Sequence, residues 1–254
     1  MNNSGIPIFL INMEQSSERL KDVKEQLDAL DLSFQRIDAT VGSQLSTTEI
    51  ASVYDAQTNK KLHHRNLTVG EIGCYVSHRK AWQALIDSNA KFGLILEDDI
   101  SINNNLPNCL QLISRSSGWD ILKISDTENV TPAQTKKVND EFNVVSYKKV
   151  PNRTMAYLLT AEAASKLLSL KRFYRPVDVD VQCYDDFNLS VCGLRPNAVE
   201  MSLEFGLPEK SDIAQTNKGR HSSRSTFLRN LKYRWAMHRR RQHISFDVNN
   251  FNFD

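Results

Sequence analysis

The sequence lacks the features of a membrane-spanning or disulfide-stapled protein. No apolar run approaches the roughly 20 residues that a membrane-spanning helix needs. The four cysteines are scattered, without the spacing of a metal finger or the density of a disulfide scaffold, so we expect reduced, buried thiols. The opening residues, MNNSGIPIFLINM, contain no basic stretch and no small-residue cleavage site, unlike a signal peptide. These absences predict a cytoplasmic protein of ordinary globular composition.

Charge is nearly balanced over the whole chain but unevenly distributed along it. The formal net charge is +2, yet residues 213–254 hold nine Lys or Arg against two Asp, which leaves +7 there and −5 in residues 1–212. Because unpaired like charges cost stability, a segment this basic usually binds a partner. We therefore divide the chain at residue 212 into a main domain and a basic C-terminal segment.

Strand-like and helix-like segments alternate along the main domain. Apolar runs predict a strand over residues 6–13, a helix over 16–32 and a second strand over 33–40. Thr68 and Glu71 have the spacing of a capping box, which predicts a long helix beginning there. Further strands are expected over 92–97, 120–125, 143–150 and 154–160, helices over 106–115 and 161–170, and a long loop with at most short helical pieces over 42–66. This alternation is typical of an α/β domain whose mostly parallel central sheet is flanked by helices.

Three carboxylates follow directly on a buried strand. The run GLIL ends in Glu97, Asp98 and Asp99, at the strand end where ligands bind in open α/β sheets. Strand alternation would place Glu97 and Asp99 on one side and Asp98 on the other. Carboxylate oxygens suit Mg²⁺ or Mn²⁺, which would offset the mutual repulsion and bridge to a pyrophosphate. An ordinary acidic loop is the alternative, and these residues alone leave both open.

Five segments occur together in the order seen in a known family. They are FLINMEQSSERL, LTVGEIGCYVSHRKAW, GLILEDDI, MAYLLTAEAASKLL and RPVDVDVQ. With them the sequence resembles glycosyltransferase family 25, the lipopolysaccharide and lipooligosaccharide sugar transferases related to collagen galactosyltransferases, over about residues 6–205. The resemblance implies a GT-A-like single catalytic domain within residues 1–212 and a nucleotide-sugar donor, most often UDP-galactose. It also implies metal-assisted, inverting transfer of a hexose onto a lipooligosaccharide or another surface glycan.

The resemblance gives the acidic cluster its expected roles. Asp99 is expected to bind Mn²⁺ or Mg²⁺ directly, Glu97 to be a second ligand or its neighbour, and Asp98 to contact the donor's ribose or sugar. Such an ion stabilises the charge that grows on the diphosphate leaving group.

Two further motifs of the resemblance supply candidate donor contacts. Asn12 and Arg19 lie where the family borders its nucleotide pocket, and Arg19 has the fork geometry to pair with a phosphate. A solvated helix arginine is the alternative for Arg19. His78 and Arg79 follow in the SH motif and are expected to contact the donor phosphates or the acceptor, although a structural histidine would also explain His78.

Inverting transfer needs a base that takes the proton of the acceptor hydroxyl. Pro176 disfavours a helix, so we expect the segment from Pro176 to Asp180 to be extended, with Asp178 and Asp180 on one face. One of these two carboxylates would then be the base and the other would orient the acceptor. A polar edge strand is the structural alternative.

The basic segment has its own expected partner. On a helix, Phe227, Leu228, Leu231 and Trp235 would share an apolar face opposite a cationic remainder. That composition resembles an interfacial helix attracted to anionic lipid, which would hold the protein on the inner face of the inner membrane; nucleic-acid binding is the less favoured alternative. Three residues before this helix are expected to close over the donor: Gln215, His221 and Ser222.

Two other functions remain open from the sequence. A sugar nucleotidyltransferase has a similar architecture, but it normally needs a glycine-rich loop after the first strand, and INMEQSSERL has none. A non-enzymatic peripheral membrane or RNA-binding protein would leave the acidic cluster incidental.

Overall fold

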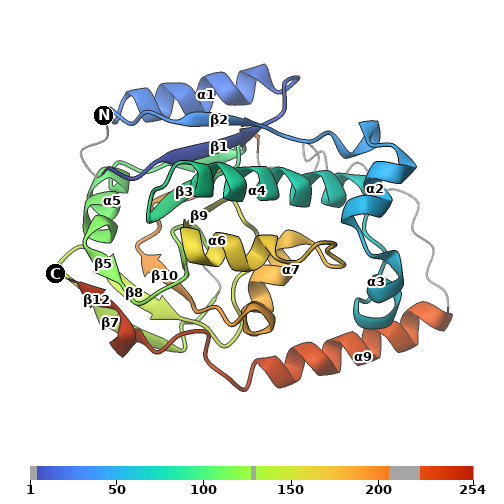
Figure 1. Ribbon diagram of the computed structural model, residues 1–254. Helices are drawn as coiled ribbons and strands as arrows, with labels where there is room; N and C mark the ends of the chain where they lie inside the picture. The colour runs from blue at the N-terminus through green and yellow to red at the C-terminus, as the bar shows by residue number, and fades with distance from the viewer. Residues whose placement is uncertain (1–4, 127–129, 206–223, 254) are drawn as a thin grey trace.

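The computed structural model describes residues 5–126, 130–205 and 224–253, with the side chains of 224–228 excepted. An eight-stranded sheet of order β2-β1-β3-β9-β6-β10-β8-β7 forms its centre (Figure 1). The strands are β1 (Ile8–Asn12), β2 (Gln35–Asp38), β3 (Phe92–Leu96), β6 (Ile121–Lys123), β7 (Gln134–Lys137), β8 (Asn143–Ser146), β9 (Ala156–Thr160) and β10 (Val191–Arg195). Only β8 and β9 run against the direction of the others. The predicted α/β fold with a mostly parallel sheet is confirmed.

Helices pack on both faces of this sheet and beside it. The α-helices of the described residues are α1 (Ser17–Asp28), α2 (Thr47–Val53), α3 (Ala56–Leu62), α4 (Val69–Asp87), α5 (Leu106–Ser114), α6 (Ala161–Leu168), α7 (Val177–Gln182) and α9 (Arg224–Arg240). One core contains apolar residues of α1 and α5, and the other contains those of α4, α6 and α7. Alternate residues of β1 point to opposite cores, Leu10 to the first and Phe9 to the second. Burial on both faces explains why the central strands are continuous apolar runs rather than alternating ones.

The predicted start of the long helix is confirmed in detail. Thr68 Oγ1 accepts a hydrogen bond from the backbone N–H of Glu71 at 3.2 Å, and the Glu71 carboxylate accepts one from the backbone of Thr68 at 2.8 Å. Residues 42–66 contain the short 3₁₀ turn η1 (Gly42–Gln44) and the helices α2 and α3, each of seven residues, as expected for a long loop with short helical pieces.

The segment after Pro176 is helical, so the prediction of an extended chain there is wrong. Pro176 is the residue before the first turn of α7, a place where its missing N–H costs nothing. Its steric restriction falls on the preceding residue, not on those that follow. Positions two apart on a helix do not face each other, so Asp178 and Asp180 diverge instead of sharing a face.

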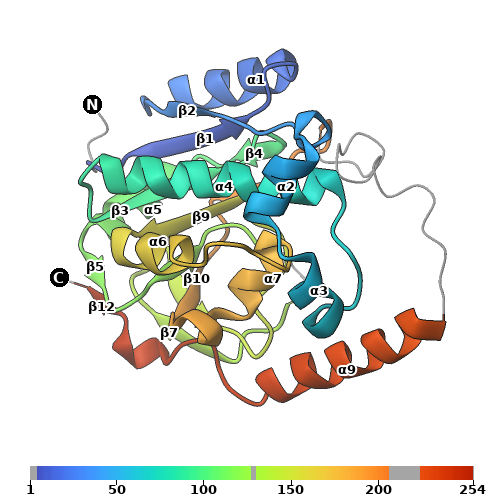
Figure 2. The ribbon, with the colours of Figure 1, turned by 45° about the vertical axis from the view of Figure 1, so that its right-hand side comes forward.

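The C-terminal residues return to the body of the protein. Phe246, Val248 and Phe251 pack in the core that contains α1 and α5. Strand β12 (Asn252–Phe253) pairs with β5 (Ser116–Ser117), and β11 (Val199–Met201) pairs with β4 (Ile100–Ile102). Figure 2 shows α9 along the outside of the molecule beside α3. Within the described ranges no helix is both long and apolar enough to cross a bilayer. The boundary at residue 212 lies outside the described residues, and the two-part division stays a prediction.

Candidate active site

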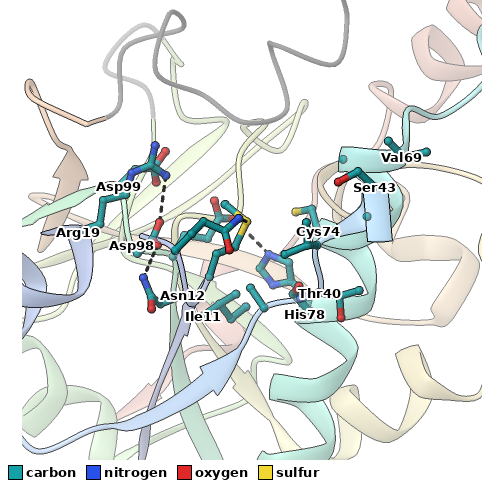
Figure 3. Close-up of a pocket in the computed structure, with 18 residues that line it drawn as sticks. Ile11, Asn12, Arg19, Thr40, Ser43, Val69, Cys74, His78, Asp98 and Asp99 are labelled. Atoms are coloured by element: carbon teal, nitrogen blue, oxygen red, sulfur yellow. Dashed lines mark hydrogen bonds and ion pairs between the residues drawn. The ribbon is translucent and has the colours of Figure 1, made fainter. Parts of the chain in front are cut away.

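A cavity of about 330 Å³, here called cavity A, opens at the carboxyl ends of β1, β2 and β3 (Figure 3). The first turns of α4 and residues 39–43 form its other walls. These walls meet closely because Gly73 and Gly42 lie at their contact: a Cβ on Gly73 would come within 2.5 Å of the Thr40 carbonyl oxygen. The Thr40 backbone also donates a hydrogen bond to Ser77 Oγ at 2.8 Å, which fixes residues 39–43 on α4.

Six of the residues predicted to serve donor or metal binding line cavity A. They are Asn12, Arg19, His78, Glu97, Asp98 and Asp99. They come from four separate parts of the chain, and the parallel arrangement of β1 and β3 brings the ends of those strands to one edge of the sheet. The structure thus places together the residues that the sequence only suggested.

Asp98 is buried and held by the first β-α unit. Asn12 Nδ2 donates to Asp98 Oδ2 at 2.7 Å, and the Arg19 guanidinium lies 3.4 Å from the other carboxylate oxygen. Arg36 in turn donates to Asn12 Oδ1 at 2.9 Å, which orients the amide. Burial raises the pKa of Asp98, and the contacts with Asn12 and Arg19 oppose that rise. Because both oxygens already have partners, Asp98 suits orienting Arg19 at the cavity better than binding a cation.

Glu97 belongs to a hydrogen-bonded chain that runs into the core. Its Oε1 lies 3.2 Å from His78 Nε2 and accepts a hydrogen bond from Thr154 at 2.7 Å. His78 Nδ1 lies 2.9 Å from the Tyr157 hydroxyl, which accepts from Trp82 Nε1 at 2.8 Å. That hydroxyl can donate its single proton to Nδ1, which leaves the proton of His78 on Nε2, facing Glu97. Burial acts to raise the pKa of Glu97, but the contacts with His78 and Thr154 bring it below its ordinary value.

Asp99 is the carboxylate of the cluster with the least compensation, since among the described residues only the Arg19 charge and a backbone hydrogen bond lower its pKa. Its Oδ1 is buried and has no hydrogen-bond partner in the described part of the chain. Burial, followed by the charges of Glu97 and Asp98, raises its pKa to about 7. A divalent cation would satisfy this oxygen and remove the repulsion, and Mg²⁺ and Mn²⁺ prefer such oxygen ligands. Asp99 with Glu97 therefore fits the cation that the sequence predicted.

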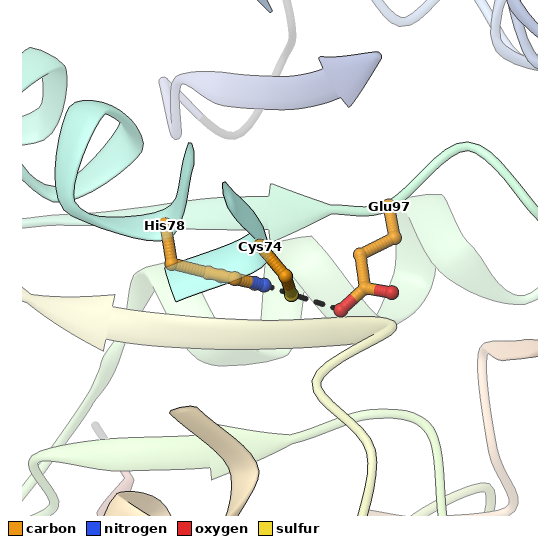
Figure 4. A group of neighbouring side chains, drawn as sticks. All are labelled: Cys74, His78 and Glu97. Carbon is orange, nitrogen blue, oxygen red and sulfur yellow. Dashed lines mark hydrogen bonds and ion pairs between the residues drawn. The ribbon is translucent and has the colours of Figure 1, made fainter. Parts of the chain in front are cut away.

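A second possible ligand set adjoins the first. Atoms of Cys74, His78 and Glu97 lie within 4.8 Å of one another (Figure 4). Sulfur and nitrogen ligands would favour Zn²⁺ over Mn²⁺. However, burial and nearby carboxylates raise the pKa of the Cys74 thiol well above its ordinary value, so it is protonated and a poor ligand at neutral pH. Both ring nitrogens of His78 are also engaged. The carboxylate set is the better cation site.

Comparison with known proteins shows the family of this chain. The sequence profile described as glycosyltransferase family 25 (LPS biosynthesis protein) matches residues 5–183. The chain belongs to this family. It is 29% identical over 180 residues to a glycosyltransferase 25 family member of Aedes aegypti, covering 68% of this chain and 29% of that protein. It is 24% identical over 188 residues to procollagen galactosyltransferase 1-A of Xenopus laevis, covering 68% and 30%.

The match to a bacterial relative covers a larger share of that relative's length. The chain is 26% identical over 189 residues to a putative glycosyltransferase of Haemophilus influenzae, a match that covers 74% of this chain and 66% of that protein. The matches to the mosquito and frog proteins, by contrast, span less than a third of those longer chains. The family-25 match includes every residue that we place around cavity A and ends before α9.

Two residues predicted for this family-25 site lie elsewhere. Asp180 is fully buried: Tyr75 donates to it at 2.6 Å, and the Arg175 guanidinium bonds it at 2.6 Å. The hydrogen bond from Tyr75 anchors α7 to α4, and the buried ion pair with Arg175 argues against a catalytic role. Arg79 donates to the Leu170 carbonyl at 2.7 Å and does not line cavity A. Sequence spacing could not show this, because both contacts join segments distant in the chain.

Replacing Asp180 tests its structural role. We expect Asp180→Asn to lower the free energy of unfolding by about 3 kcal/mol, because the buried Arg175 would keep only the partly exposed Asp186 as its ion-pair partner. Urea unfolding followed by circular dichroism measures the change, with Asp140→Asn, a fully exposed carboxylate, as the control. Unchanged stability together with lost activity would instead indicate a catalytic role for Asp180.

Asp178 does not line cavity A. It lines a second cavity, here called cavity B, of about 720 Å³ between α3, α7 and α9. Burial raises its pKa; Lys123 lowers it, whereas the negative charges of Glu71 and Glu97 raise it further. Glu97 lines cavity A, so the charge of Asp178 in cavity B interacts with a carboxylate of the first site.

Sequence reasoning missed Lys123. It lies in β6 with only 2% of its surface exposed, and its Nζ donates to the Arg153 carbonyl at 2.6 Å. Burial lowers its pKa to about 8, and the carboxylates of Asp126, Asp178 and Glu97 oppose that fall. A lysine inside the otherwise apolar strand DILKIS was the feature of the sequence that could have indicated a buried charge there. The expected closing residues Gln215, His221 and Ser222 lie outside the described residues.

Proposed function

We propose that the protein is a metal-dependent glycosyltransferase that binds a nucleotide sugar in cavity A. The observation that carries this proposal is the uncompensated Asp99 oxygen beside Glu97, at the sheet edge where β1 and β3 end. Membership of glycosyltransferase family 25 supports the transfer of a sugar, in preference to nucleotidyl transfer or a non-enzymatic role. The turn between β1 and α1 also lacks the glycine-rich loop that a nucleotidyltransferase needs.

The residues of cavity A have distinct roles in this proposal. Asp99 and Glu97 would hold Mn²⁺ or Mg²⁺, which supplies Lewis-acid stabilisation of the leaving diphosphate. Arg19, oriented by Asp98, adds a fixed positive charge for the same phosphates. His78 holds the Glu97 carboxylate in place, so little reorganisation accompanies donor binding. UDP-galactose is the donor that the resemblance favours, and the name of the frog relative is consistent with galactose.

Transfer would proceed with inversion, and Asp178 is our candidate base. Its carboxylate faces cavity B, and its raised pKa gives it stronger proton affinity than an ordinary aspartate. As the acceptor oxygen attacks the anomeric carbon, its proton would pass to Asp178 and the bond to the diphosphate would break. Asp180, tied to Arg175, is not retained for this role.

Donor binding can be tested directly by thermal shift. At a ligand concentration about a hundredfold above Kd, UDP-galactose with Mn²⁺ should raise the melting temperature by about 5 °C or more. The same sugar with a chelator is the matched control and should give a much smaller shift. UDP-glucose and UDP-N-acetylglucosamine compare the sugars. Equal shifts with and without Mn²⁺ would contradict a cation that joins donor to protein.

We further propose that α9 holds the enzyme at an anionic membrane surface on the cytoplasmic side, where a lipooligosaccharide acceptor would be presented. Leu231 and Trp235 are 59% and 62% exposed on this helix, among several arginines. The Arg239 guanidinium lies 5.0 Å from the Trp235 ring centroid, so cationic and apolar groups share one surface. That combination favours the boundary between lipid headgroups and acyl chains.

Vesicle sedimentation tests this surface. Replacing Leu231 and Trp235 together by Ser should weaken binding to phosphatidylserine-containing vesicles about tenfold or more, because both side chains lose apolar burial in the lipid. Added salt should also weaken the binding of the wild-type protein to these vesicles. Leu203→Ser is the control, because Leu203 is an exposed apolar residue outside α9, with 87% of its surface accessible. Unchanged vesicle binding by the double variant would exclude α9 as the anchor.

A further inference from the structure

Cavity B adjoins cavity A across the first turn of α4. Gly70 lines cavity A, and the next residue, Glu71, lines cavity B. Asp178 lines cavity B. Two adjoining cavities, one of them with a carboxylate in its wall, are what a transfer between two bound sugars requires.

Helix α9, which forms one wall of cavity B, is attached at both ends. Near its start, the Arg229 guanidinium donates to the His63 carbonyl at 3.1 Å and to Asn59 Oδ1 at 3.2 Å, at the C-terminal end of α3. Near its end, Arg240 forms ion pairs with Asp185 and, at 2.6 Å, with Asp186. These attachments hold the wall at a fixed distance from α3 and α7.

The walls of cavity B carry unbalanced positive charge. Lys149, Arg234 and Arg241 line it, and none of the three has an ion-pair partner in the part of the chain that the structure describes. Arg65 also lines it but is paired bidentately with Glu71. A ligand that bears a phosphate or a carboxylate would supply the missing negative charge.

A buried histidine in the same cavity offers unused hydrogen bonds. His63 is 1% exposed, and neither ring nitrogen has a hydrogen-bond partner among the described residues. Burial, then the charges of His64 and Arg65, lowers the pKa of His63 to about 3, so the ring is neutral. One nitrogen then donates and the other accepts, which matches a sugar hydroxyl. The ring centroids of His64 and Tyr233 lie 4.3 and 5.0 Å from that of His63, so the three rings form an aromatic wall.

We propose that cavity B is the acceptor site and that it takes a saccharide bearing a phosphate or carboxylate group. Lys149, Arg234 and Arg241 bind the anionic group, the His63–Tyr233 wall contacts the sugar, and Asp178 receives the proton of the reacting hydroxyl. The acceptor role rests on the proposed glycosyltransferase function. Tyr233 and Arg234 belong to α9 and Arg241 follows it directly, all beyond the family match at residues 5–183, whereas Lys149 and His63 lie within that match.

Tryptophan fluorescence can report binding at this site. Of the three tryptophans, Trp82 and Trp119 are buried, and Trp235 lines the mouth of cavity B. Glucose 6-phosphate should change the emission and saturate, with a Kd at least about tenfold lower than those of glucose and inorganic phosphate. Lys149→Gln and Arg234→Gln should each raise the Kd for glucose 6-phosphate about tenfold, and Lys21→Gln, an exposed lysine of α1, should not.

The outcomes separate this inference from the proposed function. Equal affinity for inorganic phosphate, or unchanged affinity in both glutamine variants, would overturn a saccharide site in cavity B. Asp99→Asn should bind glucose 6-phosphate as the wild type does, because Asp99 belongs to cavity A. If glucose 6-phosphate binds as expected but no UDP-sugar is turned over, the anionic-sugar site stands and the acceptor role fails.

Discussion

Asp99→Asn is expected to reduce Mn²⁺-dependent turnover of a UDP-sugar by about a thousandfold or more. Loss of a ligand to the cation would remove several kcal/mol of stabilisation from the developing diphosphate charge. The fold should persist, because Asp99 Oδ1 has no hydrogen-bond partner among the described residues. Release of UDP measured with a coupled assay gives the rate, and Asp140→Asn controls for loss of a carboxylate at an exposed position.

The same substitution should change how stability depends on pH. The pKa of Asp99 rises from 3.8 to about 7 on folding, so the native state binds more protons than the unfolded chain between these values. Stability of the metal-free wild type should therefore fall as pH rises from about 4 to about 7, and the asparagine variant should lack this component. Melting temperatures at pH 5 and pH 8 measure it. An Asp99→Asn protein that melts with the wild-type pH dependence and turns over normally would remove the metal role.

Asp178→Asn is expected to lower kcat for sugar transfer by about 10²–10⁴-fold, the usual contribution of a general base. Donor binding in cavity A should stay within about twofold, because Asp178 does not line that cavity. The Mn²⁺-dependent thermal shift with UDP-galactose checks this point on the same variant.

The pH profile gives a second readout for Asp178. Burial raises its pKa, and a base must be ionised to accept a proton, so the acid limb of kcat/KM should lie above the range of an ordinary aspartate. The limb should disappear in Asp178→Asn. Asp180→Asn is the contrasting variant, since it should lose stability and keep its rate at low temperature. The reverse pattern would exchange the roles of the two residues.

Local patterns predicted the elements well where neighbours in the chain supply the physical cause. The α4 capping box needs only Thr68 and Glu71, so spacing sufficed to find it. The central strands followed from runs of apolar residues that tolerate burial on both faces. The segment after Pro176 failed because the proline was taken to exclude a helix on its C-terminal side, whereas it occupies a favourable place before the first turn.

Long-range contacts separated equivalent-looking residues. Asp178 and Asp180 stand two positions apart in the sequence, yet one lines cavity B and the other is buried against α4, where it accepts a hydrogen bond from Tyr75. Glu97, Asp98 and Asp99 likewise differ in their partners: His78 with Thr154, Asn12 with Arg19, and for Asp99 Oδ1 no hydrogen bond within the described residues. No pattern within one segment encodes such differences.

Periodicity and adjacent residues were sufficient to predict the α/β fold and the three carboxylates at a strand end, and the resemblance of five ordered segments was sufficient to predict the family. The assembled fold shows that Asp99 Oδ1 has no hydrogen-bond partner among the described residues, and that the charges of the buried Lys123 and Asp178 interact with that of Glu97. It also decided that α9 closes a second, cationic cavity against α3 and α7. The physical reason is that burial and electrostatic neighbourhood depend on side chains distant in sequence, which meet only when the sheet and its helices assemble.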